Sequence, residues 1–273
     1  MENPSFHTNK FKKMLETKWL GRSFRFFDEI DSTNTFLKKL PVNELQHGDV
    51  VLANAQVKGR GQHQKSWITE PGRNLTFTMA FKPNRADRFT LLTLSLAYGA
   101  MTVLQKYSDE KLQLKWPNDL MAGSKKIGGI LTECAFMGTR PERVLIGMGL
   151  NILQEEFPDD IYESATSLSH ITNTELNRED IFAQLLNVFE GFYEKWESGD
   201  PELHKLISKN LVGFGEWVRL KIDDQLTDKR FKFLGVNEKG ELLVINDNLE
   251  LNTFSHEQIR IITGNESISK ISS

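Results

Sequence analysis

The longest uncharged apolar stretch of the chain, residues 90–104 (TLLTLSLAYGAMTVL), limits what the chain can fold into. It is shorter than the ~20 residues that cross a bilayer, and it contains Gly99. We therefore predict a buried helix in a globular fold, with no membrane partner.

The amino-terminal residues lack the apolar core of a signal peptide. The one cysteine, Cys134, ends an apolar strand and is expected to be a small buried side chain. A cytoplasmic protein is predicted.

Composition narrows the class of protein further. A chain of 273 residues is long enough for one large domain or two unequal ones. Its share of AVILMFWYC residues, 39%, and of charged residues, 26%, excludes general disorder, collagen-like repeats and a disulfide scaffold. The formal net charge of −3 argues against a surface built for broad nucleic-acid binding, so no nucleic-acid partner is expected.

The spacing of apolar residues predicts helices and strands in the first part of the chain. Ser32 or Thr33 begins a short helix that ends at Pro41, and residues 178–197 form the strongest helix. A short helix follows Pro201. The residues before about 26 have room for one short helix but not for a helix-turn-helix module. Strands are predicted at 50–53, 74–81, 112–116, 128–134 and 143–153, the second of them half-buried because its apolar residues alternate with threonines.

The pattern changes after Asn210, where no further helix-length apolar period occurs. Short strand-like runs at 217–222, 229–236, 241–245 and 258–262 are separated by turn residues. We therefore predict a first domain over residues 1–211, a small all-β barrel over 212–264, and a frayed tail over 265–273.

A polar loop over residues 59–67 (GRGQHQKSW) is the first segment whose residue types suit a binding site. Gly59 and Gly61 flank Arg60, and glycines let backbone N–H groups converge on an anion. By itself the segment reads more often as a surface hairpin. It lacks the terminal Lys-Ser/Thr of a P-loop and the third glycine of a dinucleotide fingerprint. Both interpretations stay open from these residues alone.

Three further motifs follow, at 115–119 (KWPND), 126–131 (KIGGIL) and 147–151 (GMGLN). The first reads as a turn as often as a site, with amide and carboxylate oxygens that suit a nucleotide or Mg²⁺. Adjacent glycines in the second and spaced glycines in the third indicate close approach of a ligand or of a neighbouring backbone. Lys126 is placed to stabilise developing negative charge, and Asn151 can both donate and accept hydrogen bonds.

Taken together and in this order, these motifs resemble those of the biotin protein ligases. The resemblance runs from about Asp31 to Ile262 and includes Ser32-Thr33-Asn34, Gln56 and the GRG…W loop. The pairing of KWPND with KxGGIL is highly specific for that family. The resemblance implies an α/β (α+β) fold. Its catalytic domain would be like that of class II aminoacyl-tRNA synthetases, with a mixed sheet and flanking helices, followed by an SH3-like barrel.

The resemblance also implies a reaction in two steps. Biotin and MgATP would give biotinyl-5′-AMP and pyrophosphate, and the adenylate would acylate one lysine of a biotin carboxyl carrier protein, such as that of acetyl-CoA carboxylase. Lys126, Arg60 and Lys65 would be catalytic, offsetting the repulsion between the two anions. The implied biotin-binding residues are Ser32, Thr33, Asn34, Gln56, Gly59, Arg60, Gly61, Gln62, Lys126, Gly128 and Gly129. The implied ATP and adenylate residues are Lys65, Trp67, Lys115, Asn118, Asp119, Gly147, Gly149 and Asn151.

The loop departs from the common family form, in which Arg-Arg-Gly-Arg follows GRG. Gln62, Gln64 and Lys65 stand here instead of an arginine, the glycine and the last arginine. Lysine lacks the planar fork of arginine, which leaves open how tightly the adenylate is retained. We hypothesise that Gln64 stiffens the loop.

Two other functions compete with the biotin ligase. A lipoate or octanoate ligase of the same fold lacks the KWPND…KxGGIL pairing, and a lipoyl group has no ureido ring for a Ser/Thr/Gln pocket to bind. A biotin-responsive repressor carries an amino-terminal DNA-binding domain, which the pattern before Ser32 does not predict. A monofunctional ligase is therefore expected. The sequence leaves open whether it forms a homodimer and which residues bind Mg²⁺.

Overall fold

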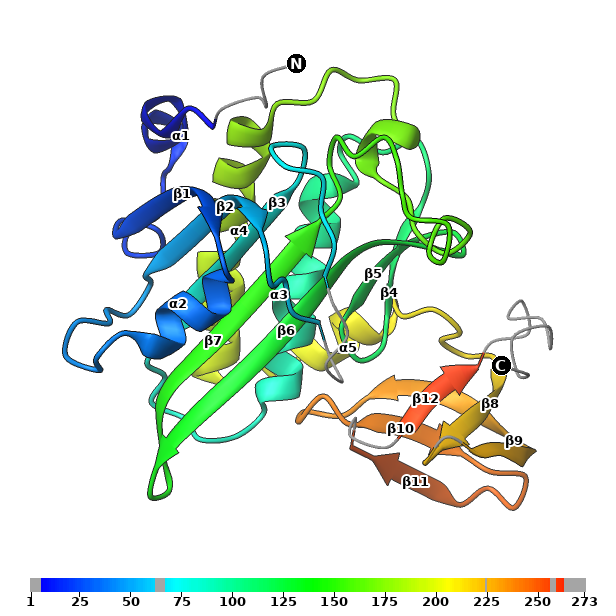
Figure 1. Ribbon diagram of the computed structural model, residues 1–273. Coiled ribbons are helices and arrows are strands. Elements are labelled where there is room, and N and C mark those ends of the chain that lie inside the picture. Colours follow the sequence, from blue (N-terminus) through cyan, green and yellow to red (C-terminus); the bar gives the residue numbers. More distant parts are fainter. Residues whose placement is uncertain (1–5, 62–66, 224, 256–258, 263–273) are drawn as a thin grey trace.

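The computed structural model describes residues 6–61, 67–223, 225–255 and 259–262, which form a seven-stranded and a five-stranded sheet (Figure 1). The large sheet has the strand order β1-β2-β3-β7-β6-β5-β4, and the small sheet has the order β11-β10-β9-β8-β12. The strands of the large sheet are β1 (Phe24–Ile30), β2 (Val50–Gln56), β3 (Leu75–Phe81), β4 (Leu112–Lys115), β5 (Asp119–Ala122), β6 (Lys125–Met137) and β7 (Arg140–Leu150). Those of the small sheet are β8 (Trp217–Ile222), β9 (Gln225–Val236), β10 (Leu242–Ile245), β11 (Leu251–Phe254) and β12 (Ile259–Ile262).

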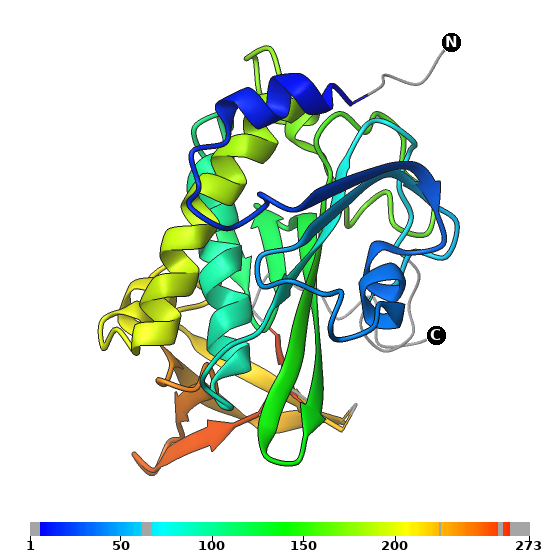
Figure 2. The ribbon, with the colours of Figure 1, turned by 90° about the vertical axis from the view of Figure 1, so that its left-hand side faces the viewer.

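The large sheet is mixed, as predicted, because β1 and β2 run parallel while every other pair is antiparallel. Two long helices, α3 (Phe89–Leu104) and α4 (Arg178–Ser198), cover one of its faces, and the short α2 (Thr33–Lys39) lies on the other (Figure 2). The remaining helices are α1 (Thr8–Met14) and α5 (Leu203–Ser208). The helix predicted from the apolar stretch 90–104 is thus confirmed as α3. No helix of the described residues is long and apolar enough to span a bilayer.

The main core lies between the large sheet and the pair α3 and α4. Phe77 of β3 packs edge-on against Phe182 and nearly parallel to Phe189, both on α4. Gly99 lets the two helices approach closely, since a Cβ there would lie 3.1 Å from the rings of Phe189 and Phe192. Burying one such aromatic or aliphatic side chain stabilises a fold by about 1.5–3 kcal/mol. The aromatic stripe of α4 is therefore core packing.

The predicted helix start at Ser32 is confirmed, and the structure shows capping residues at both ends of α4. Ser32 is the N-cap of α2, and its Oγ accepts a hydrogen bond from the Thr35 N–H at 3.5 Å. Asn177 caps α4 in the same way, and Gly199 ends that helix in the left-handed region at φ 76°. Before β1, the described residues contain one helix, α1, which packs against α4.

Three strands escaped the sequence prediction. The sequence FRFFDEI of β1 does not alternate regularly between apolar and polar residues, because its first four residues are three phenylalanines and one arginine. Strands β5 and β11 are only four residues long and begin or end at turn residues. Each strand is stabilised by pairing with a neighbouring strand rather than by its own apolar pattern. A pattern read over a few consecutive residues does not show such pairing.

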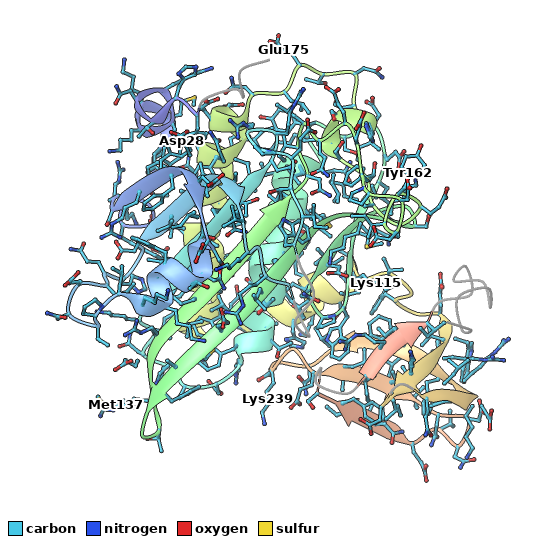
Figure 3. All side chains as sticks on the ribbon, viewed as in Figure 1. Asp28, Lys115, Met137, Tyr162, Glu175 and Lys239 are labelled. Carbon is cyan, nitrogen blue, oxygen red and sulfur yellow. The ribbon has the colours of Figure 1, made fainter. Side chains whose placement is uncertain are left out.

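Two burial predictions were wrong. Strand β3 is buried along its whole length, because α2 and Trp67 cover the face that carries its threonines. Cys134 is exposed, because β6 and β7 extend as a hairpin past the helices. Met137 at the tip of this hairpin is 71% exposed, and Figure 3 labels it at the outer end.

The small sheet follows α5 and is antiparallel throughout. Its strands include the four runs predicted after Asn210. The predicted boundary at 211/212 falls between α5 and β8, where Leu211 still bridges to Leu114 of the large sheet. We keep that boundary as a proposal. The predicted tail over 265–273 lies outside the described residues.

Candidate functional site

The two faces of the large sheet differ sharply in side-chain size. On the face covered by α3 and α4, β3 and β7 present bulky side chains such as Phe77 and Met148. On the opposite face, Thr76 and Thr78 of β3 lie directly across from Gly149 and Gly147 of β7, and Gly149 also lies across from Gly129 of β6. The glycine floor, defined as Gly129, Gly147 and Gly149, leaves the sheet backbone open to a ligand.

A cavity of about 900 Å³ lies over this floor. Its walls come from the start of α2, the end of β2, the loop after β2, the turn between β4 and β5, and the segment after β7. The charged residues of the wall are four cations and two carboxylates, which favours anionic ligands. The sequence-predicted residues that line it are Ser32, Thr33, Asn34, Gln56, Arg60, Gly61, Trp67, Lys115, Asn118, Asp119, Lys126, Gly129, Gly147, Gly149 and Asn151.

Two of the described predicted residues, Gly59 and Gly128, are not among those that line the cavity. Gln62 and Lys65, like Gln64, lie outside the described residues. Gly128 faces the helix side of the sheet, where a Cβ would lie 2.6 Å from the Leu150 side chain. Gly59 packs against the Trp67 backbone, and a Cβ there would lie 2.2 Å from the Trp67 carbonyl oxygen. Both glycines permit close packing of the protein itself, since neither is among the lining residues.

One end of the cavity is polar and uncharged. The backbone N–H and the hydroxyl of Thr33 donate hydrogen bonds to Gln56 Oε1 at 2.8 and 3.0 Å. The Thr78 hydroxyl lies 2.7 Å from Thr33 Oγ1 and also contacts Asn34 Oδ1. These contacts orient the Gln56 amide, whose nitrogen donates no hydrogen bond within the described part of the chain and so remains available to a ligand.

Glu133 of β6 ties this end together. Its carboxylate accepts hydrogen bonds from Asn34 at 3.1 Å and from Lys38 at 3.1 Å, and it lies 3.3 Å from Arg60 Nη1. Burial disfavours its charge, but the hydrogen bonds from Asn34 and Lys38 and the charge of Arg60 hold the pKa of Glu133 below its ordinary value. The ionised carboxylate therefore holds α2 and the GRG loop in fixed positions.

The other end of the cavity carries the charges. Lys126 Nζ forms an ion pair with Asp119 Oδ1 at 2.6 Å and lies 5.6 Å from the centre of the Trp67 ring. The Lys126 backbone is held on both sides, since its N–H donates to Ser164 and its carbonyl accepts from Thr166. The ion pair and the backbone contacts together fix the ammonium group over the glycine floor.

Trp67 lies against the sheet because Gly149 has no side chain. A Cβ on Gly149 would lie 2.3 Å from the indole of Trp67. The Trp67 indole nitrogen and the Thr76 hydroxyl are both buried and find no hydrogen-bond partner among the described residues. Buried polar atoms in native structures are nearly always paired. Both residues line the cavity, so a bound ligand would supply the missing partners.

The two asparagines predicted for the nucleotide side are anchored through their amide nitrogens. Asn118 Nδ2 donates to the Ile130 carbonyl at 2.7 Å, and Asn151 Nδ2 donates to the Thr166 carbonyl at 3.0 Å. Both side chains are buried and both line the cavity. Their side-chain oxygens accept no hydrogen bond from the described residues, and each is a fixed acceptor for an amino group.

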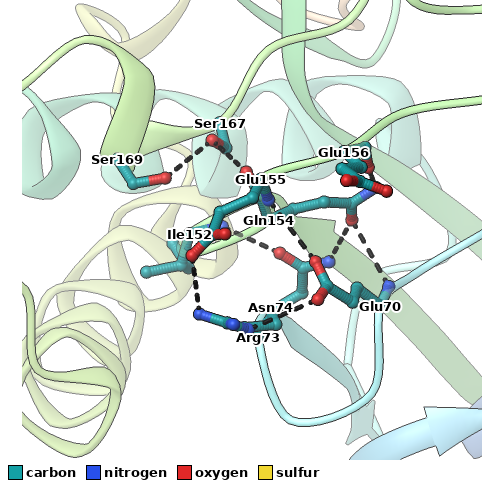
Figure 4. Close-up of polar contacts among 9 residues, drawn as sticks. All are labelled: Glu70, Arg73, Asn74, Ile152, Gln154, Glu155, Glu156, Ser167 and Ser169. Atoms are coloured by element: carbon teal, nitrogen blue, oxygen red, sulfur yellow. Dashed lines mark hydrogen bonds and ion pairs between the residues drawn. The ribbon is translucent and has the colours of Figure 1, made fainter.

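Sequence reasoning missed the segment after β7, although Phe157, Asp160, Ile161, Ser164 and Ala165 line the cavity. A buried polar network fixes this segment (Figure 4). Asn74 Oδ1 accepts from the Ile152 N–H at 3.0 Å and its amide contacts Gln154, while Ser167 donates to the Gln154 carbonyl at 2.7 Å. Arg73 adds ion pairs to Glu70 and Glu155. The segment has no periodic pattern, so no local signal marks it.

The small sheet also reaches the cavity, through Arg260 of β12. Nothing in the local sequence distinguishes this arginine from other surface cations. Its position depends on how the two sheets pack. Trp116 Nε1 donates to the Gly240 carbonyl at 3.0 Å, and Arg88 at the start of α3 pairs with Glu238 at 3.2 Å. Lys115, beside Trp116, lies on the side of the large sheet nearest the small one (Figure 3).

Comparison with known proteins shows what this chain is similar to. Residues 26–151 match the model of the biotin/lipoate A/B protein ligase family. The chain is 28% identical over 235 residues to the bifunctional ligase/repressor BirA of Bacillus subtilis, covering 84% of this chain and 71% of the relative. It is also 28% identical over 180 residues to a biotin–[acetyl-CoA-carboxylase] ligase of Mycobacterium tuberculosis, covering 64% of this chain and 65% of that protein.

A solved structure has the same fold. Biotin protein ligase from Aquifex aeolicus, in complex with biotin and ATP, aligns with a TM-score of 0.76 over 88% of this chain and 98% of that chain, at 24% identity. The predicted resemblance to the biotin protein ligases is thus confirmed by relatives along the chain, and the predicted fold class by this structure.

Proposed function

We propose that the chain is an ATP-dependent biotin ligase. In the first step, a carboxylate oxygen of biotin attacks the α-phosphorus of ATP, pyrophosphate leaves, and biotinyl-5′-AMP forms. In the second, the ε-amino group of a carrier lysine attacks the acyl carbon and AMP leaves. The acceptor is a biotin carboxyl carrier protein, that of acetyl-CoA carboxylase or a related carboxylase.

One observation carries this proposal: a single cavity joins an uncharged polar end to a cationic end across the glycine floor. Biotin needs hydrogen-bond partners for its ureido ring and a positive field for its carboxylate. Thr33 and Gln56, held in place by the Thr78 hydroxyl, supply the first requirement, and Lys126 and Lys115 the second. A site built from hydrogen-bonding groups rejects an analogue that lacks the matching atoms, because its own polar groups are then left unpaired.

We assign roles to the lining residues on the same basis. Lys126 stabilises the charge that develops as the two anions react, and Asp119 positions Lys126 through their ion pair. Arg60 and Lys65 are proposed to assist from the loop. The proposed biotin contacts are Ser32, Thr33, Asn34, Gln56, Arg60, Gly61 and Gly129. The proposed ATP and adenylate contacts are Trp67, Lys115, Asn118, Asp119, Gly147, Gly149 and Asn151.

Mg²⁺ is proposed as the partner of the ATP phosphates. Within the described residues there is no group of three or more His, Cys, Asp or Glu side chains that could enclose a metal ion. Mg²⁺ in nucleotide enzymes instead uses one or two carboxylates, substrate phosphates and water. Asp119 and Asp160 are the carboxylates of the cavity wall and would be its protein ligands. The ion would neutralise phosphate charge.

The test is ATP–pyrophosphate exchange by the purified protein, with biotin, lipoate, octanoate or no acid. We expect exchange with biotin alone, followed by transfer of biotin to a carrier domain. Exchange with lipoate or octanoate instead would replace biotin as the substrate while leaving the adenylation site in place. An absence of exchange with every acid would favour a regulatory protein. We also propose a cytoplasmic location. Sedimentation of the purified protein would show whether it forms a homodimer.

A further inference from the structure

The outward face of the small sheet carries cations in directly opposed pairs. In the strand register, Arg219 of β8 lies opposite Arg230 of β9, and Lys221 of β8 lies opposite Arg260 of β12. Trp217, 47% exposed, lies opposite Lys232. The basic face is defined here as Trp217, Arg219, Lys221, Arg230, Lys232 and Arg260.

The fold does not require this arrangement of charge. The buried positions of these strands, such as Val218, Leu220 and Phe233, alternate with the outward ones and form the core of the small sheet. Any polar residue would serve at the outward positions, and like charges directly opposite each other destabilise a sheet. Arg219 and Arg230 take part in none of the ion pairs found among the described residues. The chain as a whole carries a net charge of −3, so the basic face is a local concentration.

Within the described residues, exposed acidic side chains stand at both ends of β8, where Glu216 precedes Trp217 and Asp223 follows Ile222. Asp223 and Asp228 are exposed at the far end of the β8–β9 hairpin, beyond the opposed arginines. One edge of the basic face leads into the cavity, because Arg260 lines its wall and is paired across β12 and β8 with Lys221. Arg219 is two residues along β8 from Lys221, or about 7 Å at the rise of a β-strand. The basic face therefore borders the cavity.

We propose that the basic face docks an acidic surface of the protein whose lysine is biotinylated. This inference rests on the proposed function. A folded acceptor cannot enter a cavity of about 900 Å³, so it inserts one lysine and rests its surface on whatever borders the opening. Opposed cations beside an exposed tryptophan fit an acidic protein surface, with the aromatic ring as the apolar contact. Continuity with the cavity favours the acceptor over a nucleic acid.

The experiment uses the full chain with Arg219→Glu, and a biotin carboxyl carrier domain of an acetyl-CoA carboxylase as the acceptor. The variant places Glu opposite Arg230, which removes a repulsive pair, so its melting temperature should equal or exceed that of the wild type. Pyrophosphate exchange with biotin should be unchanged, because Arg219 does not line the cavity. The KM for the carrier domain should rise about tenfold with kcat little changed, and added salt should raise the wild-type KM more than that of the variant.

The matched control is Lys10→Glu with Lys13→Glu on α1, which changes the net charge by more than Arg219→Glu does but on the far side of the large sheet (Figure 1). Its KM for the carrier should stay at the wild-type value. An unchanged KM for Arg219→Glu would overturn the proposal. A second result would also overturn it: the wild type binds an oligonucleotide, the variant does not, and the KM of the variant for the carrier is unchanged. The partner would then be a nucleic acid. If the wild type itself shows no biotin-dependent exchange, the proposed function fails, which this design separates from a docking failure.

Discussion

At the scale of single residues, the cavity depends on one ammonium group held in place. Lys126 is positioned by the carboxylate of Asp119 at 2.6 Å and by hydrogen bonds to its own backbone on both sides. A charge that is fixed before the reaction needs no reorganisation when negative charge develops. Position matters here as much as the charge itself.

The first prediction concerns Lys126→Ala. Removing one preorganised electrostatic contact typically lowers turnover about 10²–10³-fold, so pyrophosphate exchange should fall on that scale. Biotin affinity should change far less, because the charge acts mainly on the reacting groups. Lys125→Ala is the matched control, since Lys125 points toward the Tyr162 ring and does not line the cavity. Equal exchange in the two variants would remove Lys126 from the catalytic residues.

The second prediction concerns Gly149→Ala. The new methyl group would overlap the Trp67 indole, which must then leave the sheet and open the cavity wall. We expect loss of at least tenfold in adenylate or ATP affinity by calorimetry, with fluorescence of the tryptophans shifted toward that of exposed indole. Gly191→Ala in α4 is the control, since nothing lies within 4 Å of its added Cβ. Normal ligand affinity in Gly149→Ala would show that ligand binding does not require the packing of Trp67 against the sheet.

At the scale of elements, α4 does more than cover the sheet. Glu190 is buried and accepts hydrogen bonds from the backbone N–H groups of Lys18, Trp19 and Leu20 at 2.7, 2.9 and 2.9 Å. Burial disfavours its charge, but these hydrogen bonds hold the pKa of Glu190 below its ordinary value of 4.5. One carboxylate thus fixes the turn that leads from α1 into β1.

The third prediction follows from the sign of that shift. A carboxylate with a lowered pKa stabilises the fold above its ordinary pKa, and this contribution is lost as pH falls below about 4.5 through the folded pKa. Glu190→Gln should therefore lower the free energy of unfolding by about 1–3 kcal/mol at pH 7, and by less at pH 3.5. Urea denaturation at the two pH values measures the difference. Glu194→Gln, exposed on the same helix, should show no such dependence; if it does, the pH effect does not come from Glu190.

At the scale of the whole molecule, the two sheets share one cavity because a few contacts join them. Gly240, in the turn between β9 and β10, has φ +82°, and a Cβ there would lie 2.4 Å from the Leu91 nitrogen of α3. Its carbonyl accepts the hydrogen bond from Trp116, which stands within the KWPND turn. The turn that carries Asn118 and Asp119 is thereby coupled to the sheet that carries Arg260.

The fourth prediction tests that coupling with Gly240→Ala. The substitution strains the backbone and forces α3 and the small sheet apart, so stability should fall by about 1–3 kcal/mol and exchange should fall with it. Gly138→Ala is the control, because Gly138 has a similar φ of +62° but nothing within 4 Å of an added Cβ. A loss of exchange in both variants would trace the effect to backbone strain rather than to the contact between the sheets.

The sequence by itself determined the helices and most of the strands, because capping residues, apolar periods and glycines act over a few neighbouring positions. Ser32 at the start of α2 and the apolar spacing along α4 are such cases. It also indicated the residues of the cavity, through motifs that resemble a known family. The short strand β5 could not be found in this way, because pairing with β4 and β6 holds it in place.

Tertiary structure alone decided what each motif residue faces. Gly129 and Gly128 are neighbours in one motif, yet the alternation of a strand sends the first to the cavity and the second to the core. Glu133, the segment that carries Asp160, and Arg260 enter the site from places that no local pattern connects. The physical reason is that sheet register and the packing of two sheets are set by contacts between distant segments, whereas a sequence motif records only its own neighbours.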